Sequence, residues 1–456
     1  MARAFPAKVA PVLRFGNATK QTPGAVGGSR GIVVAAPRSG SGKTPATLGL
    51  LAALRQAGHV VAPAKTGPDY IDPSFLARAA GRDCVNLDPW SMAPARLKNL
   101  AAVQATGAEL LLVEGVMGLF DGAADNTGST ADLAQLLDLP VLLVVDAERQ
   151  SQSVAALVSG FAHWRPGLHM GGVILNRVAS MRHERMLVEA LAATGLPLLG
   201  AIPREAGLSL PERHLGLVLP GEIETFDTFL AAAAHAMASY VDLPRLMAIA
   251  TPLAPPCAPP RPLPPLGQRM AIASDAAFAF LYAHLLDDWR AQGAELSFFS
   301  PLADEAPSAS ADAVFLPGGY PELHGPRLAA AARFKSGLIA ARDRGALLYG
   351  ECGGFMVLGE SLVDKAGRAH AMAGLLPVTT RIDRPKRILG YRRLIQSGDL
   401  PWPGHLNGHE FHYSSARQTR LTPLFAATDA AGEAQPPMGA VIGRVMGSYA
   451  HVVDAA

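Results

Sequence analysis

The stretch YGECGGF, residues 349–355, places a cysteine in a glycine turn directly after the apolar run GALL. An apolar run, a Gly-x-Cys-x-Gly turn and a second apolar run together predict a strand, a tight turn and a helix. Such a turn raises a side chain above the sheet edge and sets backbone N–H groups beside it. Cys352 is therefore a candidate nucleophile, although a free cysteine is usually a small buried hydrophobe. The turn alone does not decide between these interpretations.

A nucleophilic thiol needs an oxyanion hole and a base, and two other segments offer them. FLPGGYPE, residues 315–322, ends an apolar run with two glycines. The N–H groups of Gly319 and Gly353 could stabilise an acyl intermediate on Cys352. GSYAH, near the C-terminus, offers His451 after a turn. Because the chain has 13 histidines, His451 is a weak candidate by itself.

A second chemistry is indicated by APRSGSGKT, residues 36–44, between a predicted strand and a predicted helix. Its glycines let the backbone curl so that N–H groups point at phosphate oxygens. Lys43 would reach the outer phosphates of a nucleotide, and the Thr44 hydroxyl would bind magnesium. In this loop we expect ATP to be bound by Gly40, Ser41, Gly42, Lys43 and Thr44.

The loop departs from the strict Walker pattern, because Pro37 stands where its first glycine would be. The alternative is an ordinary glycine-rich turn with a surface lysine, and the position between strand and helix argues against it. Asn176, at the end of GGVILN, could bind the adenine edge. An ordinary strand-end turn is the alternative there.

Magnesium requires further oxygen ligands. Glu114 ends the apolar run ELLLVEG, and Asp72 lies in KTGPDYIDP after another run. We expect Thr44, Asp72 and Glu114 to hold the metal, although Asp-Pro is also a common turn signal. The residues proposed to bind phosphate or a substrate carboxylate are Lys65, Asp69 and Tyr70.

The elements that position these residues are predicted by hydrophobic patterning. Continuous apolar runs suit the buried strands of a parallel sheet: GIVVAAP, VVAPAK, ELLLVEG, PVLLVVD and GGVILN. Intervening stretches with helical spacing predict an α/β fold in doubly wound order. A proline-rich stretch follows, and a second α/β series then begins with RMAIASD, LSFFSP, DAVFLPGG and GALLYGE. Residues 370–456 look richer in strands and turns.

Composition excludes several functions. A net charge of +2 gives no electrostatic case for nucleic acid, and no window has the roughly eighteen uninterrupted apolar residues of a membrane span. The cysteines Cys84, Cys257 and Cys352 are too far apart for a disulfide framework or a zinc spacing. A reducing cytoplasm is the simplest compartment, and Cys257 is expected to be incidental.

Taken together, these motifs resemble a known family. YGECGG, LPGGYPE and SYAH resemble the class I glutamine amidotransferase domain of the cobalamin-pathway branch. With RSGSGKT, KTGPDYIDP, NLDPW, EGVMGLFDG, RHLGL and GHEFHYS, the chain from Gly31 onward is similar to the cobyrinic or hydrogenobyrinic acid a,c-diamide synthases. The resemblance implies a dethiobiotin-synthetase-like P-loop domain joined to a flavodoxin-like α/β amidotransferase domain. We expect a disordered basic arm (1–29), a P-loop ATP- and substrate-binding synthetase domain (30–245), a proline-rich linker (246–267) and a class I glutamine amidotransferase domain (268–456).

The resemblance also implies an activity. Cys352 would attack glutamine with His451 as its base, and ATP with Mg2+ would activate a corrin-ring carboxylate as an acyl phosphate. Ammonia would then convert the a and c acetates to amides. The implied partners are glutamine and a corrinoid, with no nucleic acid and no membrane. The oligomeric state is not readable from the sequence, and a homodimer is one assembly we consider.

Three alternative functions stay open, and the chain departs once from the class I amidotransferase pattern. Cobyric acid synthases and nickel-sirohydrochlorin a,c-diamide synthases have related sequences, and a P-loop switch ATPase with an inactive glutaminase-like domain is a rival of another class. Ordinary class I domains place an acid two residues after the histidine, where this chain has Val453. Glu410 and His412 in GHEFHYS are candidates to orient His451, and we slightly favour a structural or substrate-facing role for them.

Overall fold

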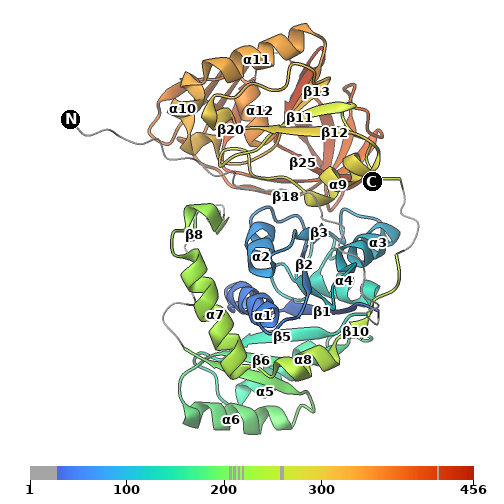
Figure 1. The fold of residues 1–456 in the computed structure, drawn as a ribbon, viewed down its shortest axis with the longest axis vertical. Helices are drawn as coiled ribbons and strands as arrows, with labels where there is room; N and C mark the ends of the chain where they lie inside the picture. The colour runs from blue at the N-terminus through green and yellow to red at the C-terminus, as the bar shows by residue number, and fades with distance from the viewer. Residues whose placement is uncertain are drawn as a thin grey trace, which may run out of the picture. The chain divides into compact units, whose positions relative to one another are not determined.

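The computed structural model describes residues 28–204, 208, 212–213, 216–217, 220–256, 261–418 and 421–456, which form two compact units (Figure 1). The N-terminal unit holds the described residues between 28 and 262, with Tyr282–Leu285 and Val453–Ala456. The C-terminal unit holds Leu263–Leu281 and Leu286–Val452. Most of the predicted basic arm and Cys257 lie outside the described residues, and the bounds of the four predicted segments stay a prediction.

A parallel sheet forms the centre of the N-terminal unit. Its strands are β1 (Arg30–Ala35), β2 (Val61–Thr66), β3 (Val85–Leu87), β4 (Leu110–Glu114), β5 (Val141–Asp146), β6 (Met170–Val178) and β7 (Leu198–Pro203), in the order β3-β2-β4-β1-β5-β6-β7. Every residue of β2, β4 and β5 is buried, as continuous apolar runs covered on both faces require. The five predicted strands and the predicted α/β class are confirmed.

Helices cover both faces of this sheet. They are α1 (Lys43–Gln56), α2 (Asp72–Ala80), α3 (Pro94–Ala105), α4 (Thr130–Leu137), α5 (Ser153–His163), α6 (Met181–Ala192), α7 (Phe226–Tyr240) and α8 (Leu243–Ile249). Right-handed crossovers place α1 and α2 on one face, where α7 packs on α1, and α3–α6 on the other. Gly49 permits the close α1–α7 approach, because a Cβ there would lie 2.7 Å from the Ala233 carbonyl oxygen. None of the helices in the described ranges has the length and apolar character needed to cross a membrane.

Short elements follow β7. Strands β8 (Glu212–Arg213) and β9 (Gly216–Leu217) pair with each other, so the RHLGL motif lies only partly within the described residues. A 3-10 turn, η1 (Pro220–Glu222), precedes α7. β10 (Thr251–Pro252) runs antiparallel to β1. Together α8 and β10 occupy the first part of the stretch that we expected to be a linker, and the described residues 253–256 and 261–265 have no regular secondary structure.

A second, mostly parallel sheet organises the C-terminal unit. Its strands are β11 (Arg269–Ala273), β12 (Glu295–Phe299), β13 (Ala313–Leu316), β14 (Leu347–Glu351), β23 (Ala440–Ile442) and β24 (Val445–Ser448), in the order β12-β11-β13-β14-β24-β23 with β23 antiparallel. The associated helical elements are α9 (Ala283–Ala291), η2 (Pro301–Ala303), η3 (Pro321–Leu323), α10 (Gly325–Ala330), α11 (Ala332–Asp343) and α12 (Gly353–Leu358). The four strands predicted for this unit are confirmed.

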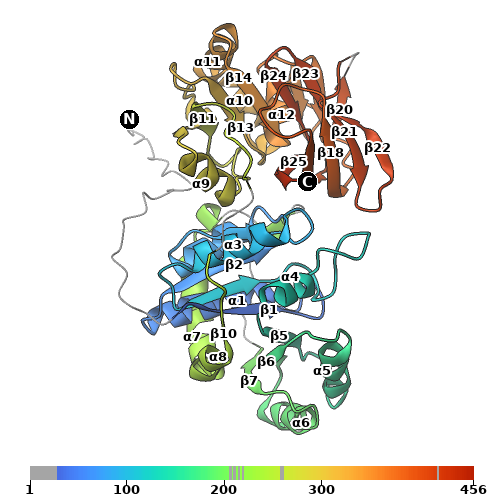
Figure 2. The ribbon, with the colours of Figure 1, turned by 90° about the vertical axis from the view of Figure 1, so that its right-hand side faces the viewer.

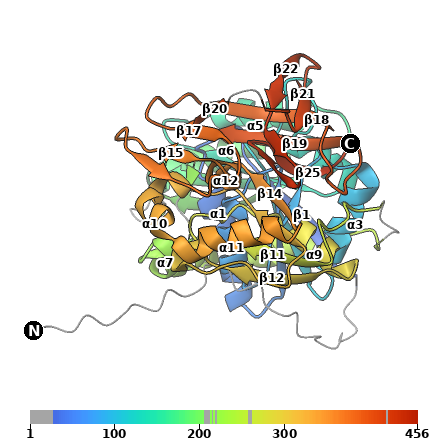
Figure 3. The same ribbon diagram turned by 90° about the horizontal axis from the view of Figure 1, so that it is seen from above.

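Beyond α12, the described residues form strands and turns without a helix, as predicted. One sheet has the order β16-β15-β17-β20, and another has the order β22-β21-β18-β19-β25. The bounds are β15 (Ser361–Val363), β16 (Ala369–Ala371), β17 (Val378–Arg381), β18 (Ile388–Gln396), β19 (His405–His412), β20 (Ser415–Gln418), β21 (Phe425–Asp429), β22 (Ala434–Met438) and β25 (His451–Ala455). Within this unit, β18, β21 and β22 lie at the side opposite α11 (Figures 2 and 3).

Candidate active sites

The loop between β1 and α1 adopts the curl that phosphate binding requires. Gly40 and Gly42 have φ angles of 80° and 88°, a left-handed conformation that glycine adopts without strain. Ser41 is buried, and its hydroxyl donates to the Arg38 carbonyl oxygen at 2.9 Å. Helix α1 begins at Lys43, so the unpaired N–H groups of its first turn face this loop. The loop is therefore shaped to receive an anion.

Asn176, in β6, braces this loop. Its Nδ2 donates to the Ser41 carbonyl oxygen at 3.0 Å, and its Oδ1 accepts from the Arg177 N–H at 3.0 Å. A Cβ at Gly42 would overlap the same Nδ2, so a glycine is needed where the side chain crosses the loop. The predicted contact of Asn176 with adenine stays a prediction, while the geometry assigns it a supporting contact with the loop.

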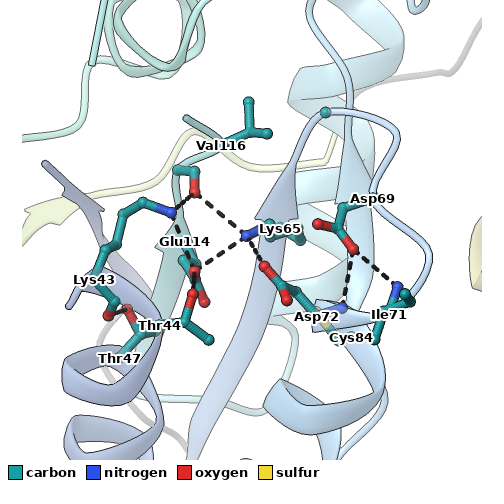
Figure 4. A network of polar contacts seen from close by, with 12 residues as sticks. Lys43, Thr44, Thr47, Lys65, Asp69, Ile71, Asp72, Cys84, Glu114 and Val116 are labelled. Atoms are coloured by element: carbon teal, nitrogen blue, oxygen red, sulfur yellow. Dashed lines mark hydrogen bonds and ion pairs between the residues drawn. The ribbon is translucent and has the colours of Figure 1, made fainter. Parts of the chain in front are cut away.

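Lys43 and Thr44 converge on one buried acid, Glu114 (Figure 4). Lys43 Nζ lies 3.2 Å from Glu114 Oε1 and also donates to the Gly115 carbonyl oxygen. Thr44 Oγ1 donates to the same carboxylate oxygen at 2.6 Å. β4 lies beside β1 with Val34 opposite Glu114, which brings this strand end to the start of α1.

A second lysine enters the same network from β2. Lys65 Nζ lies 2.5 Å from Asp72 Oδ2 and 3.1 Å from Glu114 Oε1 (Figure 4). Lys65 lies opposite Glu114 in the β2–β4 register, which explains the contact. The Lys65 ammonium therefore lies between the two carboxylates that we predicted to be metal ligands. The sequence predicted that Lys65 binds phosphate or a substrate carboxylate, and did not indicate that it lies between these two acids.

The loop after β2 is shaped by polar contacts of its own. Asp69 Oδ1 accepts from the backbone N–H groups of Ile71 at 2.8 Å and Asp72 at 2.9 Å. Asn86, in the NLDPW motif, donates from Nδ2 to the Asp69 carbonyl oxygen at 2.8 Å. Tyr70 is buried. Asp69 and Asn86 thus set the loop conformation, and ligand roles for Asp69 and Tyr70 stay predictions.

The charged groups of this network shift one another's pKa values. Burial disfavours a charge on Glu114, but Lys65 and Lys43 outweigh burial and lower the pKa of Glu114 to about 2. Burial, then the nearby Lys65, lower the pKa of Lys43. Burial also opposes the charge on Lys65, yet Asp72 and Glu114 outweigh it and raise the pKa of Lys65. A phosphate beside Lys43 would favour the protonated form of that lysine.

The residues present fit a magnesium ion that is bound together with a nucleotide. Glu114 Oε2 is buried and has no hydrogen-bond partner within the described parts of the chain. Thr44 and Glu114 supply the hard oxygen atoms that magnesium prefers. Within those same parts, no group of three or more His, Cys, Asp or Glu side chains could hold a metal by itself. Phosphate oxygens and water would therefore complete the coordination, as is usual for magnesium.

The candidate nucleophile lies on a strained turn in the C-terminal unit. β14 ends at Glu351, Cys352 follows, and α12 begins at Gly353. The Cys352 backbone has φ 45° and ψ −103°, a region that residues other than glycine rarely adopt. Its N–H donates to the Ser448 carbonyl oxygen at 2.8 Å. The predicted strand, turn and helix are confirmed, and strain of this kind is typical of functional turns.

Glycines let the backbone segments around the thiol approach one another. A Cβ at Gly354 would overlap the Leu316 carbonyl oxygen, and one at Gly319 would overlap the Ala277 carbonyl oxygen. A Cβ at Gly353 would lie 3.0 Å from the Gly319 nitrogen. The two backbone amides predicted to form an oxyanion hole thus lie close together, and their function stays a prediction.

His451 begins β25 and is completely buried. A Cβ at Gly318 would overlap His451 Cε1, so glycine at this position makes room for the imidazole. The Phe280 ring lies 6.2 Å from the imidazole, measured between centroids. Gly318, in the PGG turn, is a site residue that was not predicted from the sequence. The motif suggested N–H donors, and it does not show that a glycine there makes room for the imidazole.

We expect Gly318→Ala to lower glutaminase kcat by at least about 10-fold, because the added methyl group displaces the imidazole. Steady-state glutamine hydrolysis measures the effect. Gly404→Ala is the matched control, since a Cβ there meets nothing within 4 Å. Equal activity of the two variants would contradict the placement of His451 in the site.

A buried carboxylate that the sequence analysis did not consider faces His451. Glu351 Oε2 lies 3.7 Å from His451 Nδ1. The two residues that we named as orienting candidates are engaged with each other: His412 Nε2 and Glu410 Oε1 are 2.8 Å apart. Arg392 Nε also donates to Glu410 Oε2 at 2.9 Å. Glu351 directly precedes Cys352 in YGECGG, and that adjacency was the available signal.

Burial disfavours the charged forms of the Cys352 thiol and the His451 imidazole. Burial, then the nearby Glu322, raise the pKa of Cys352. Burial, then His409 and His412, lower the pKa of His451 well below its usual value. Proton transfer from the thiol to the imidazole would therefore need groups that stabilise the resulting charges.

Comparison with known sequences assigns each part of the chain to a known domain family. The profile of the CobB/CobQ-like glutamine amidotransferase domain matches residues 269–455, and that of the CobQ/CobB/MinD/ParA nucleotide binding domain matches residues 32–218. The chain is thus an amidoligase that joins a nucleotide-binding domain to a glutamine amidotransferase domain.

Its relatives define the family more closely. A protein of Brucella suis biovar 1 (strain 1330), named hydrogenobyrinate a,c-diamide synthase, is 54% identical over 438 residues, which cover 93% of this chain and 98% of that protein. Proteins of the same name from Rhizobium meliloti and Rhodobacter capsulatus are 51% and 50% identical, and each match covers 93% of this chain and 99% of the relative. The chain belongs to the hydrogenobyrinate a,c-diamide synthase family, and the resemblance predicted from its motifs is confirmed.

Proposed function

We propose that this chain converts the a and c acetate carboxylates of hydrogenobyrinic acid to amides in cobalamin biosynthesis, with glutamine as nitrogen donor and ATP as activating nucleotide. The observation that carries the proposal is the 50% to 54% identity, across nearly the whole length, to proteins that bear this name. The names of these relatives favour the cobalt-free hydrogenobyrinic acid over cobyrinic acid as the substrate. The reaction needs a reduced Cys352, which supports the cytoplasmic location predicted from the cysteines.

In the glutaminase step, Cys352 Sγ gives its proton to His451 and attacks Cδ of glutamine. The N–H groups of Gly319 and Gly353 stabilise the oxyanion of the tetrahedral intermediate. The Cδ–N bond then breaks, and nitrogen leaves as ammonia with the proton from His451. Water hydrolyses the resulting thioester, which releases glutamate and restores the thiol. The strained Cys352 turn, with the close Gly319 and Gly353 amides, supports these roles.

In the synthetase step, an acetate oxygen attacks the γ-phosphorus of ATP, ADP leaves, and an acyl phosphate forms. The loop amides and Lys43 hold the triphosphate, while Lys65 neutralises charge on the phosphoryl group or the acetate. Magnesium, held by Thr44 and Glu114 with phosphate oxygens, would neutralise charge on the β- and γ-phosphates. Ammonia then attacks the acyl carbon, and inorganic phosphate leaves. Lys43, Lys65 and Glu114 support this assignment because they lie in one buried network.

The two steps require each other chemically. A carboxylate is a poor electrophile, and phosphorylation supplies the leaving group that amide formation needs. Ammonium at neutral pH is not a nucleophile, so ammonia must be generated locally and used before it is protonated. One chain that carries both a P-loop and a nucleophilic thiol supplies both reagents.

Product mass tests the proposal. The purified chain is incubated with ATP, Mg2+, glutamine and, in separate reactions, hydrogenobyrinic acid, cobyrinic acid, its a,c-diamide and nickel sirohydrochlorin. We expect hydrogenobyrinic acid to gain two amides, and omission of ATP or glutamine to prevent the gain. Amidation of the a,c-diamide instead would indicate a cobyric acid synthase. Amidation of nickel sirohydrochlorin alone would indicate the nickel enzyme, and no amidation of any ring would support the switch ATPase.

A further inference from the structure

The conventional position for an acid near the catalytic histidine carries no carboxylate in this chain. Two residues after His451 comes Val453, an apolar side chain that is completely buried. A proposed Cys–His pair without a third group lacks a means of selecting the imidazole tautomer and stabilising the imidazolium. Another group must therefore select the His451 tautomer and stabilise its imidazolium.

Glu351 meets the geometric requirements from a different strand. Its Oε2 lies 3.7 Å from His451 Nδ1, and the side chains of both residues are almost completely buried. Its other oxygen, Oε1, accepts from the Tyr349 hydroxyl at 3.0 Å and from the Val452 N–H at 3.1 Å. Two donors thus hold Oε1, and the second of them comes from the residue next to His451. The carboxylate is fixed with Oε2 turned toward the imidazole.

We propose that Glu351 positions His451 for glutamine hydrolysis, an inference that rests on the proposed Cys352–His451 pair. The ionised carboxylate accepts a hydrogen bond from Nδ1–H and leaves the Nε2 lone pair free to take the thiol proton. It then stabilises the imidazolium that forms. A separation of 3.7 Å exceeds a hydrogen bond, and catalytic hydrogen bonds in free enzymes commonly shorten when substrate binds.

The rival carboxylate, Glu410, has partners that occupy both of its oxygens. Oε1 contacts His412 at 2.8 Å, and Oε2 contacts Arg392 at 2.9 Å. Burial disfavours its charge, but His412 and Arg392 outweigh burial and lower the pKa of Glu410. Removing Glu410 from this pairing would leave the Arg392 charge buried without its partner, which is costly.

The protonation of Glu351 gives this arrangement a pH dependence. Burial raises the pKa of Glu351 to about 8. Below that pH Glu351 is protonated, and the proton lies on Oε2 because Oε1 accepts two hydrogen bonds. The Oε2–H group then donates to Nδ1, so the imidazole carries its own proton on Nε2 and cannot act as base. Above that pH, the carboxylate selects the competent tautomer. The other titratable groups around the Glu351 and His451 side chains are Tyr349, Cys352, His409 and His412.

The Glu351→Gln variant distinguishes a role of Glu351 in positioning His451 from a structural role in the fold. Glutamine keeps Oε1 for the Tyr349 and Val452 donors but turns an NH2 group toward His451 Nδ1. We expect glutaminase kcat to fall by at least about 100-fold with little change in KM, while ammonia-dependent amidation and Tm match the wild type. Glu360→Gln, at an exposed position in the same unit, is the control.

A second measurement needs no variant. The alkylation rate of Cys352 by iodoacetamide, read by peptide mass, should rise as the pH passes about 8 in the wild type and lose that rise in Glu351→Gln. A Glu351→Gln kcat within about threefold of Glu360→Gln, or no such rise in the wild type, would overturn the proposal. A lower Tm of Glu351→Gln together with loss of its ammonia-dependent amidation would indicate that the role of Glu351 is purely structural. That result would also overturn the proposal. A wild type without glutaminase activity would instead refute the proposed function.

Discussion

Cys352→Ala is expected to abolish glutamine-dependent amidation while amidation driven by added ammonia survives. The variant has no nucleophile for glutamine, so kcat with glutamine should fall by at least about 1000-fold. The P-loop network contains no contribution from residue 352, so the activated carboxylate can still accept free ammonia. Product mass with glutamine or with ammonium chloride at alkaline pH, where more ammonia is present, measures both reactions.

The control for this variant removes another thiol. Cys257→Ala, in the proline-rich stretch, should retain both reactions if that cysteine is incidental. Loss of the ammonia-driven reaction in Cys352→Ala, with the protein still folded by circular dichroism, would show that the proposed division of labour between the two sites is wrong. Retained glutamine-dependent turnover would show that Cys352 is not the nucleophile.

Lys43→Ala is expected to abolish amidation with either nitrogen source. Lys43 lies at the start of α1, and its buried ammonium contacts Glu114 at 3.2 Å. Without it, the transferring phosphoryl group loses a preorganised positive charge, and kcat should fall by about 100- to 1000-fold. Glu114 keeps Lys65 as a partner at 3.1 Å, so we expect the fold to persist. ADP release with hydrogenobyrinic acid and ammonia measures the loss.

An exposed lysine in the same unit serves as the control. Lys98→Ala, on α3, should leave ADP release and product mass unchanged. Ammonia-dependent amidation that persists in Lys43→Ala would mean that ATP does not activate the carboxylate at this loop. The combined outcome distinguishes the two sites, because Cys352→Ala affects one nitrogen source and Lys43→Ala affects both.

Much of the fold could be predicted because its signals are local. Continuous apolar runs recover β1, β2, β4, β5 and β6, since strands buried on both faces consist mostly of apolar residues. Glycines mark both candidate site turns, because Gly42 has a positive φ and the backbone around Gly354 leaves no room for a Cβ. Short elements such as β3 (Val85–Leu87) were missed, because three residues carry too little periodicity.

The sequence by itself determined the classes of chemistry: a glycine loop with Lys43 and Thr44 for phosphate, and a strained turn for Cys352. These follow from backbone rules that act over a few residues. Only the tertiary structure decided which side chains meet. Lys65 lies between Glu114 and Asp72 because β2 pairs with β4, and Glu351 faces His451 across strands that are about 100 residues apart in the chain. Strand order and register arise from burial of the whole sheet, so the adjacency of Glu351 to Cys352 in the sequence could not show by itself that Glu351 faces His451.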